Sequence, residues 1–388
     1  MNQTKKLYDL DAYAIEFDAT VLSCEEVQTE DQIMYHVILD QTLFFPEEGG
    51  QSPDKGTMNQ IAVIDVQIKD DVITHTLEAP LEVGVGVHGC IDWKHRFNNM
   101  QQHSGEHIFS GLVNKKFGYD NVGFHLSDQI VTMDFNGVLT AEDAADIEYA
   151  VNEVIINNLP VQVTFPSKEE LSDMNYRSKI EIDGQVRIVT IEGVDVCACC
   201  APHVRSTGEI GMLKILNMQN YKGGVRISIL CGFRALEEYR KKTEILSELT
   251  FSLSANQDSL IEAVDKLKNV NQSLKVEVSV AKKECMEAKL KGIPKDQVNV
   301  YLFENNLDAQ VMRNAVNQLV TEHAGICGIF SGDDEGGYRY IIGSSTEDAR
   351  MIASILREKL GAKGGGSAAM VQGSVVAKKD MILALIKL

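Results

Sequence analysis

Residues 233–292 constrain the organisation of the chain more than any other stretch. The segment has no proline, no glycine before its last residue, and charges of alternating sign. Leucine recurs every seven residues, at Leu246, Leu253, Leu260, Leu267 and Leu274. A seven-residue apolar repeat of this length is typical of a long helix with a coiled-coil seam. We therefore expect a long helical linker over 233–292, either joining two copies as a homodimer or packed on its own domain.

The sequence on either side of the linker predicts an α+β protein of several domains. Short apolar runs of β-branched residues, broken by turn residues, indicate a small N-terminal β-barrel-like domain over residues 1–95. Mixed helical and strand patterns over 96–232 indicate an α+β domain, with a partly buried helix from Arg96 to Lys116. Alternating strand and helix patterns over 293–388 indicate a small C-terminal α/β domain that closes with a glycine-rich turn.

Composition narrows the class of protein. The N-terminus has no apolar signal region, and no window offers about 18 uninterrupted apolar residues, so we expect no membrane contact and a cytoplasmic location. The eight cysteines are sparse over 388 residues except for three in VCACCAPHV, which favours metal or thiolate chemistry over a disulfide framework. A net charge of −19 works against non-specific binding of nucleic acid.

Four residues have the spacing of a metal site. His103 and His107 stand four apart in HSGEH, and Cys199 and His203 stand four apart in CCAPH. Residues i and i+4 share one face of a helix, so both imidazoles of the first pair can reach one ion. Three histidines and a cysteine form a borderline-soft set suited to tetrahedral zinc. Cys197 or Cys200 could replace Cys199, because spacing favours that cysteine without requiring it.

Glu106, inside HSGEH, is compatible with more than one kind of metal-site chemistry. An HxxEH zinc peptidase uses such a glutamate to activate a metal-bound water. A fourth protein ligand would fill the coordination sphere, which disfavours a peptidase. Glu106 is then a general base on a nearby water, an orienting group, or a solvated surface side chain. The metal could also be a structural staple in an RNA-binding or dimeric scaffold without hydrolysis.

Several segments together resemble a known family. HSGEH (103–107), CCAPHVRSTGEIGMLKI (199–215) and YKGGVRISILCG (221–232) are similar, in this order, to motifs of the editing domain of alanyl-tRNA synthetases and their free-standing relatives. FFPEEGGQSPDKG (44–56), whose composition predicts a long polar turn, resembles that family's glycine-rich loop. GGGSAAMVQGS (364–374) resembles the turn of the C-terminal module that these synthetases share with DHH phosphoesterases.

The resemblance implies editing in trans, because the editing-like region begins almost at Met1. The implied reaction is zinc-dependent hydrolysis of the ester that links serine or glycine to tRNA(Ala). By the same resemblance, His103, His107, Cys199 and His203 bind zinc. Glu106, which the family pattern does not supply, is the candidate catalytic residue on its own chemistry. The remaining implied residues are the pocket-forming Gly49, Gly50 and Gln51, then Arg226 near the tRNA end, and Gly364, Gly365, Gly366, Gln372 and Gly373 in the C-terminal turn.

This chain departs from the family pattern beside the reacting end. Family members often have threonine where this chain has Glu106, and Gly-Gly-Thr where it has Cys200, Ala201 and Pro202. The C-terminal turn has Ser367, Ala368 and Ala369 in place of Arg-Pro-Asp. The glycine-rich segment there is then either a tRNA-binding element or only a tight turn.

Overall fold

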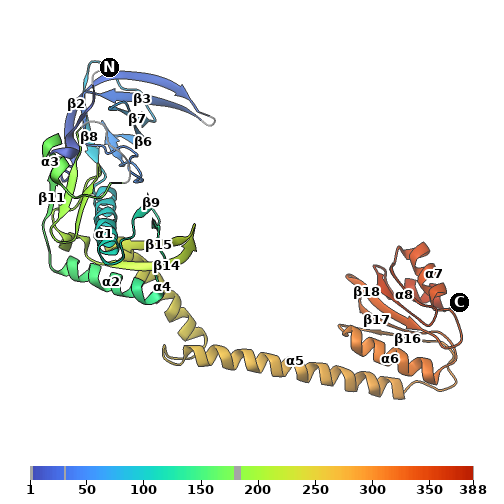
Figure 1. Cartoon of the computed structure of the whole chain (residues 1–388). Helices are drawn as coiled ribbons and strands as arrows, with labels where there is room; N and C mark the ends of the chain where they lie inside the picture. The colour runs from blue at the N-terminus through green and yellow to red at the C-terminus, as the bar shows by residue number, and fades with distance from the viewer. Residues whose placement is uncertain (1–2, 30–31, 179–184, 388) are drawn as a thin grey trace. The chain divides into compact units, whose positions relative to one another are not determined.

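The computed structural model describes residues 3–29, 32–178 and 185–387. It separates into two compact units, Met1–Ser247 and Glu248–Leu388. Both units mix helices with sheets, in agreement with the expected α+β class (Figure 1). Within the described ranges, no helix is long and apolar enough to cross a membrane.

The N-terminal part of the first unit is a closed barrel. Its strands, in order around the barrel, are β2 (Glu16–Gln28), β3 (Ile33–Leu39), β7 (Val72–Leu77), β6 (Ile61–Lys69), β5 (Gly56–Met58) and β8 (Gly86–Ile91). Two short strands, β1 (Lys5–Lys6) and β4 (Gln41–Thr42), pair in parallel beside it, and a 3₁₀ turn spans Leu7–Asp9. Burial alternates along β7, as expected for a strand with one face in a core.

The segment 44–56 is a turn region, as its composition predicts, but parts of it are buried. Phe44 and Phe45 are fully buried in the barrel core, and Asp54 is only 1% exposed. The Asp54 carboxylate accepts hydrogen bonds from the Phe45 N–H at 2.6 Å and from Nε of Arg96 at 2.9 Å. Arg96 is itself fully buried, so this charged pair fixes the loop against the helix that follows the barrel.

That helix, α1 (Trp93–Phe117), is the centre of the α+β part. Asp92 caps its start by accepting from the His95 N–H at 3.1 Å, and Gly118, at φ 71°, ends it in the left-handed conformation. Most of α1 is buried, polar residues included, because the barrel loop and two sheets surround it (Figure 1). The predicted helix, Arg96 to Lys116, begins three residues after the start of α1 and ends one residue before its end.

Two sheets and further helices make up the rest of the described part of the first unit. One sheet has the order β14 (Leu213–Tyr221), β15 (Gly224–Cys231), β10 (Val131–Phe135) and β9 (Asn121–Leu126). The other has the order β11 (Val161–Thr164), β12 (Ile188–Ile191) and β13 (Asp195–Ala198). The helices are α2 (Ala141–Ile156) and α3 (Lys168–Asp173), and a 3₁₀ turn spans Thr207–Ile210. Strands β13 and β15 both contact α1.

The expected continuous helix over 233–292 is wrong in one respect, because the segment forms two helices. These are α4 (Gly232–Ser252) and α5 (Leu260–Lys291). Between them, the Asn256 side chain accepts from the Ser259 N–H at 2.9 Å, and Ser254 takes a positive φ of 49°. Asparagine and serine side chains that bind nearby backbone groups compete with helical hydrogen bonds, so the helix is interrupted here although the leucine repeat continues.

The seven-residue repeat nevertheless leaves apolar side chains exposed on α5. Leu267 and Leu274 are 57% and 53% exposed in the single chain. The end of α5 is different, since Met286 and Leu290 are buried against the C-terminal sheet. Self-association through this helix stays a prediction.

The C-terminal part of the second unit is a five-stranded sheet with three helices. The sheet order is β16 (Val300–Glu304), β17 (Cys327–Asp333), β18 (Gly337–Gly343), β20 (Met370–Val375) and β19 (Lys363–Gly366). The helices are α6 (Ala309–Glu322), α7 (Arg350–Leu360) and α8 (Lys379–Ile386). The second unit therefore has the α/β character that its alternating sequence pattern predicts.

His75 makes the stability of the barrel depend on pH. The ring is fully buried, donates from Nδ1 to the Val37 carbonyl at 3.1 Å and accepts at Nε2 from Oγ1 of Thr42 at 2.9 Å. Burial lowers the pKa of His75 to about 4. The unfolded ring binds a proton below about pH 6.5, whereas the folded ring stays neutral down to about 4. The free energy of unfolding therefore falls as pH falls through this window, by on the order of 3 kcal/mol from this group.

We predict that His75→Gln removes this part of the pH dependence. The measurement is urea unfolding at pH 7.5 and pH 5, followed by the fluorescence of Trp93, the single tryptophan. The wild type should lose more stability than the variant between the two pH values. Equal losses in both proteins would contradict a neutral, buried His75.

Candidate metal centre

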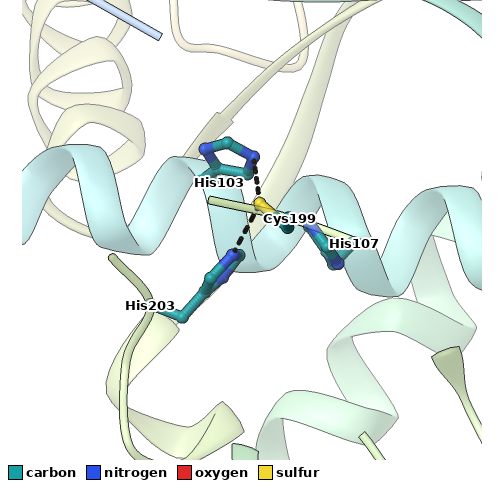
Figure 2. Close-up of side chains that lie close together, drawn as sticks. All are labelled: His103, His107, Cys199 and His203. Atoms are coloured by element: carbon teal, nitrogen blue, oxygen red, sulfur yellow. Dashed lines mark hydrogen bonds between the residues drawn. The ribbon is translucent and has the colours of Figure 1, made fainter. Parts of the chain in front are cut away.

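The structure brings the four predicted ligand residues together. His103 and His107 project from α1, while Cys199 and His203 lie in the segment that follows β13 (Figure 2). One potential ligand atom from each lies within 4.8 Å of the other three. Cys199 Sγ is 3.5 Å from Nε2 of His103 and 3.3 Å from Nε2 of His203. Two segments almost a hundred residues apart thus form one donor set.

Burial and charge give two members of this cluster the ionisation states that a metal ion requires. Burial opposes ionisation of the Cys199 thiol, but the neighbouring histidines, with hydrogen bonds from His103 and His107, hold the pKa of the thiol well below its usual value. Burial lowers the pKa of His203 to about 3, so this ring is neutral at pH 7. A thiolate and a neutral imidazole are the ligand forms of these side chains.

Each histidine of the cluster is oriented by a hydrogen bond at Nδ1. His103 Nδ1 is 2.8 Å from Oε1 of Gln51, on the barrel loop. His107 Nδ1 is 3.0 Å from Oδ2 of Asp195, and His203 Nδ1 is 3.0 Å from Oγ of Ser104. These contacts turn the Nε2 atoms toward the cluster. Histidine ligands of metals are commonly held in this way.

The arrangement fits a tetrahedral zinc ion. Three Nε2 atoms and one sulfur are donors that zinc prefers, and all four residues are buried or partly buried. Asp195 is itself fixed by Nε and Nη2 of Arg177, at 2.7 and 2.9 Å. Asp195, Arg177 and Ser104 were not predicted from the sequence. The position of Asp195, two residues before Cys197, is the signal that could have found it.

The three clustered cysteines have different surroundings. Only Cys199 lies with all three histidines, whereas Cys197 groups with His107 and Asp195. Cys200 lies beside the barrel loop, where an added Cβ on Gly49 would be 3.3 Å from its sulfur. Burial and the charge of Cys199 raise the pKa of the Cys200 thiol well above its usual value. Among the described residues, the geometry therefore favours Cys199 as the sulfur donor.

Comparisons with known proteins decide the family. A family model described as "Threonyl and Alanyl tRNA synthetase second additional domain" matches residues 186–228, and one described as "tRNA synthetases class II (A)" matches residues 4–95. The alanyl-tRNA editing protein Aarsd1 of Mus musculus is 31% identical over 381 residues, covering 94% of this chain and 92% of the relative. The chain belongs to the alanyl-tRNA editing proteins. The resemblance seen in HSGEH and CCAPH is thereby confirmed.

Other similar proteins are likewise alanyl-tRNA editing proteins or alanine–tRNA ligases. The alanyl-tRNA editing protein AlaX-L of Pyrococcus horikoshii is 30% identical, covering 97% of this chain and 96% of the relative. An alanine–tRNA ligase of Ignicoccus hospitalis is 29% identical over 94% of this chain but only 40% of the ligase. A solved C-Ala domain of Aquifex aeolicus alanyl-tRNA synthetase matches 23% of this chain and 86% of that domain, at 22% identity and a TM-score of 0.20, which carries no argument.

Glu106 is not the solvated glutamate that was one of its possible interpretations. It is 1% exposed, and its Oε1 accepts from Oγ of Ser110 and Nδ2 of Asn121, each at 2.6 Å. Its Oε2 lies 3.9 Å from Nε2 of His107, on the side of the ring that faces the cluster. A buried carboxylate is therefore held beside the donor set in this editing protein. Sequence alone gave no sign of Ser110 or Asn121.

The glycine-rich loop comes within contact distance of the cluster. Gly49 and Gly50 have φ values of 61° and 82°, and a Cβ on Gly50 would come within 2.5 Å of the Phe124 carbonyl oxygen. Only glycine fits this close approach without strain. Gln51 follows at once and reaches His103. The loop residues that the family resemblance singles out thus lie beside the cluster.

The other predicted residues lie elsewhere. Arg226, on β15, pairs with Asp134 at 2.6 and 2.7 Å and stacks over Tyr221 with 3.9 Å from its Cζ to the ring centre. Its placement near the tRNA end stays a prediction.

The C-terminal glycines form an edge strand rather than a loop. Gly364, Gly365 and Gly366 lie in β19, paired with Gln372 and Gly373 of β20 and neighbouring residues. An added Cβ on Gly364 would meet the Gln372 carbonyl oxygen at 2.3 Å, so close strand pairing accounts for this glycine. A tRNA contact at this edge stays a prediction.

We predict that zinc stabilises the first unit through Cys199 and not through Cys200. At a free zinc concentration of about 100 times Kd, binding should add about 2.7 kcal/mol to the free energy of unfolding. Thermal unfolding with zinc or with a chelator should therefore show a zinc-dependent rise in Tm for the wild type and for Cys200→Ala. Cys199→Ala should show none. The same rise in Cys199→Ala would contradict this assignment.

Proposed function

We propose that this chain is a zinc-dependent hydrolase that acts in trans on mischarged tRNA(Ala), cleaving the ester of serine or glycine. The buried His₃Cys cluster beside Glu106 is the observation that carries the proposal. Its relatives are alanyl-tRNA editing proteins, and a hydrolytic site is the chemistry that editing requires. His103, His107, Cys199 and His203 are proposed to hold the ion.

Hydrolysis of an aminoacyl ester makes only modest demands on the residues of the site. An aminoacyl ester is already activated, so a positioned water and modest polarisation suffice. Zinc, when bound, would supply orientation and polarisation of the substrate. Glu106 is proposed to take a proton from the attacking water, because its carboxylate is fixed by Ser110 and Asn121 and its second oxygen faces the cluster.

Selectivity is the second requirement of editing. The site can prefer serine to alanine if one of its polar groups forms a hydrogen bond with the serine hydroxyl. Alanine lacks that hydroxyl, so bound alanine would leave the buried polar group of the site unpaired. Gly49, Gly50 and Gln51 are proposed to shape this pocket, because their loop lies against the cluster. Arg226 and the 364–373 hairpin are proposed as tRNA contacts.

We predict that purified protein deacylates Ser- or Gly-tRNA(Ala) in a zinc-dependent manner and spares Ala-tRNA(Ala). Glu106→Gln should lower kcat by roughly 10²- to 10⁴-fold with zinc content unchanged, because it removes the base and keeps the shape. His103→Ala is the control for loss of the metal.

Two outcomes would count against this reading. Absence of hydrolysis above the His103→Ala control on all three substrates would contradict the proposed function. A Glu106→Gln variant with wild-type kcat would contradict the role of Glu106 alone and leave the deacylase standing.

A further inference from the structure

Gln51 carries a buried hydrogen-bond donor without a partner. Its side chain is 1% exposed, and its Oε1 faces Nδ1 of His103 at 2.8 Å. Within the described part of the chain and at hydrogen-bond distance, its Nε2 has no acceptor. A buried amide N–H₂ that stays unpaired costs free energy, so an acceptor supplied from outside the chain would relieve it.

The chemistry of His103 fixes which way the carboxamide faces. For Nε2 of His103 to serve as a ligand atom, the ring must carry its proton on Nδ1 and donate it. An acceptor must then stand opposite Nδ1, and in glutamine that acceptor is Oε1. The amide N–H₂ of Gln51 is consequently directed away from the ring and left for another group.

The main chain around Gln51 is held in place from both sides. The Gln51 N–H donates to the Glu48 carbonyl at 3.1 Å, and the Leu126 N–H donates to the Gly50 carbonyl at 2.7 Å. Gly50 lies so close to Phe124 that a Cβ would not fit. The donor is therefore preorganised, which is the property that makes a hydrogen-bond donor effective in a reaction centre.

We propose that Gln51 contacts the substrate directly, with Nε2 donating a hydrogen bond to an oxygen of the aminoacyl ester while Oε1 orients His103. This inference rests on the proposed deacylase function. The ester oxygens only accept hydrogen bonds, so they complement a donor that is already turned away from the histidine. Gln51 thereby couples the orientation of one zinc-ligand candidate to the recognition of the substrate.

Gln51→Glu separates the contact with the substrate from the orientation of His103. Glutamate has the same shape and still offers an acceptor to His103, but it removes the N–H₂ donor. Gln51→Leu removes both. Gln129→Glu, the same chemical change at an exposed position in the β9–β10 turn, is the matched control. All proteins are compared as full chains for zinc content, for kcat and KM on Ser-tRNA(Ala), and for the Kd of a seryl-adenosine analogue with an amide in place of the ester.

The proposal expects a distinct result for each variant. Gln51→Glu should keep its zinc, lose about 100-fold in kcat/KM and bind the analogue at least about tenfold more weakly. Gln51→Leu should also bind zinc about 10- to 100-fold more weakly, because His103 loses its orienting partner, and at saturating zinc it should show the same loss of activity. Gln129→Glu should match the wild type in every measurement.

Other outcomes overturn the proposal. If zinc-loaded Gln51→Glu and Gln51→Leu both have wild-type kcat/KM and analogue affinity, Gln51 does not contact the substrate. Reduced zinc content with unchanged kcat at saturating zinc would assign Gln51 to positioning His103 alone, which also contradicts substrate contact. A wild-type protein that hydrolyses none of the aminoacyl-tRNAs would contradict the proposed function instead, and analogue binding by Gln51→Glu would still test the contact.

Discussion

The buried pair of Asp54 and Arg96 is the interaction on which the site depends. Both side chains are withdrawn from water, and Arg96 also donates to the main-chain carbonyls of Ala12 and Leu43 at 3.0 and 2.6 Å. Removing one partner of such a pair typically costs about 3–5 kcal/mol, because the other charge is left uncompensated. Asp54 follows Gln51 by three residues, and Arg96 precedes His103 by about two helical turns. The pair therefore fixes the barrel loop and α1 in the register at which Gln51 meets His103.

Starting from the contact of Gln51 with His103, further hydrogen bonds position the remaining residues of the site. Three histidines present Nε2 to the cluster because Gln51, Ser104 and Asp195 occupy their Nδ1 atoms. Arg177 in turn fixes Asp195. Each hydrogen bond restricts the next residue, so donor atoms from α1 and from the segment after β13 are held close together. Such preorganisation reduces the ordering that binding would otherwise require.

Sequence could predict the members of the cluster but not their supports. The His103–His107 pair is visible because a four-residue spacing is local and translates directly into one helix face. Gln51 meets His103 across 52 residues, and Asp195 meets His107 across 88, so these contacts depend on tertiary packing that no periodicity reveals. The polar composition of 44–56 was misleading for the same reason, since Asp54 is buried only because Arg96 comes from elsewhere in the chain. The break at 253–259 was missed because the leucine repeat continues through it while local side-chain hydrogen bonds end the helix.

The most direct test of the account is the coordination of zinc in the loaded protein. X-ray absorption at the zinc edge, with anomalous diffraction to place the ion, should show one sulfur at about 2.3 Å and three nitrogens at about 2.0–2.1 Å. The ion should lie among His103, His107, Cys199 and His203. A shell with two sulfurs, or an ion bound away from these residues, would contradict the account.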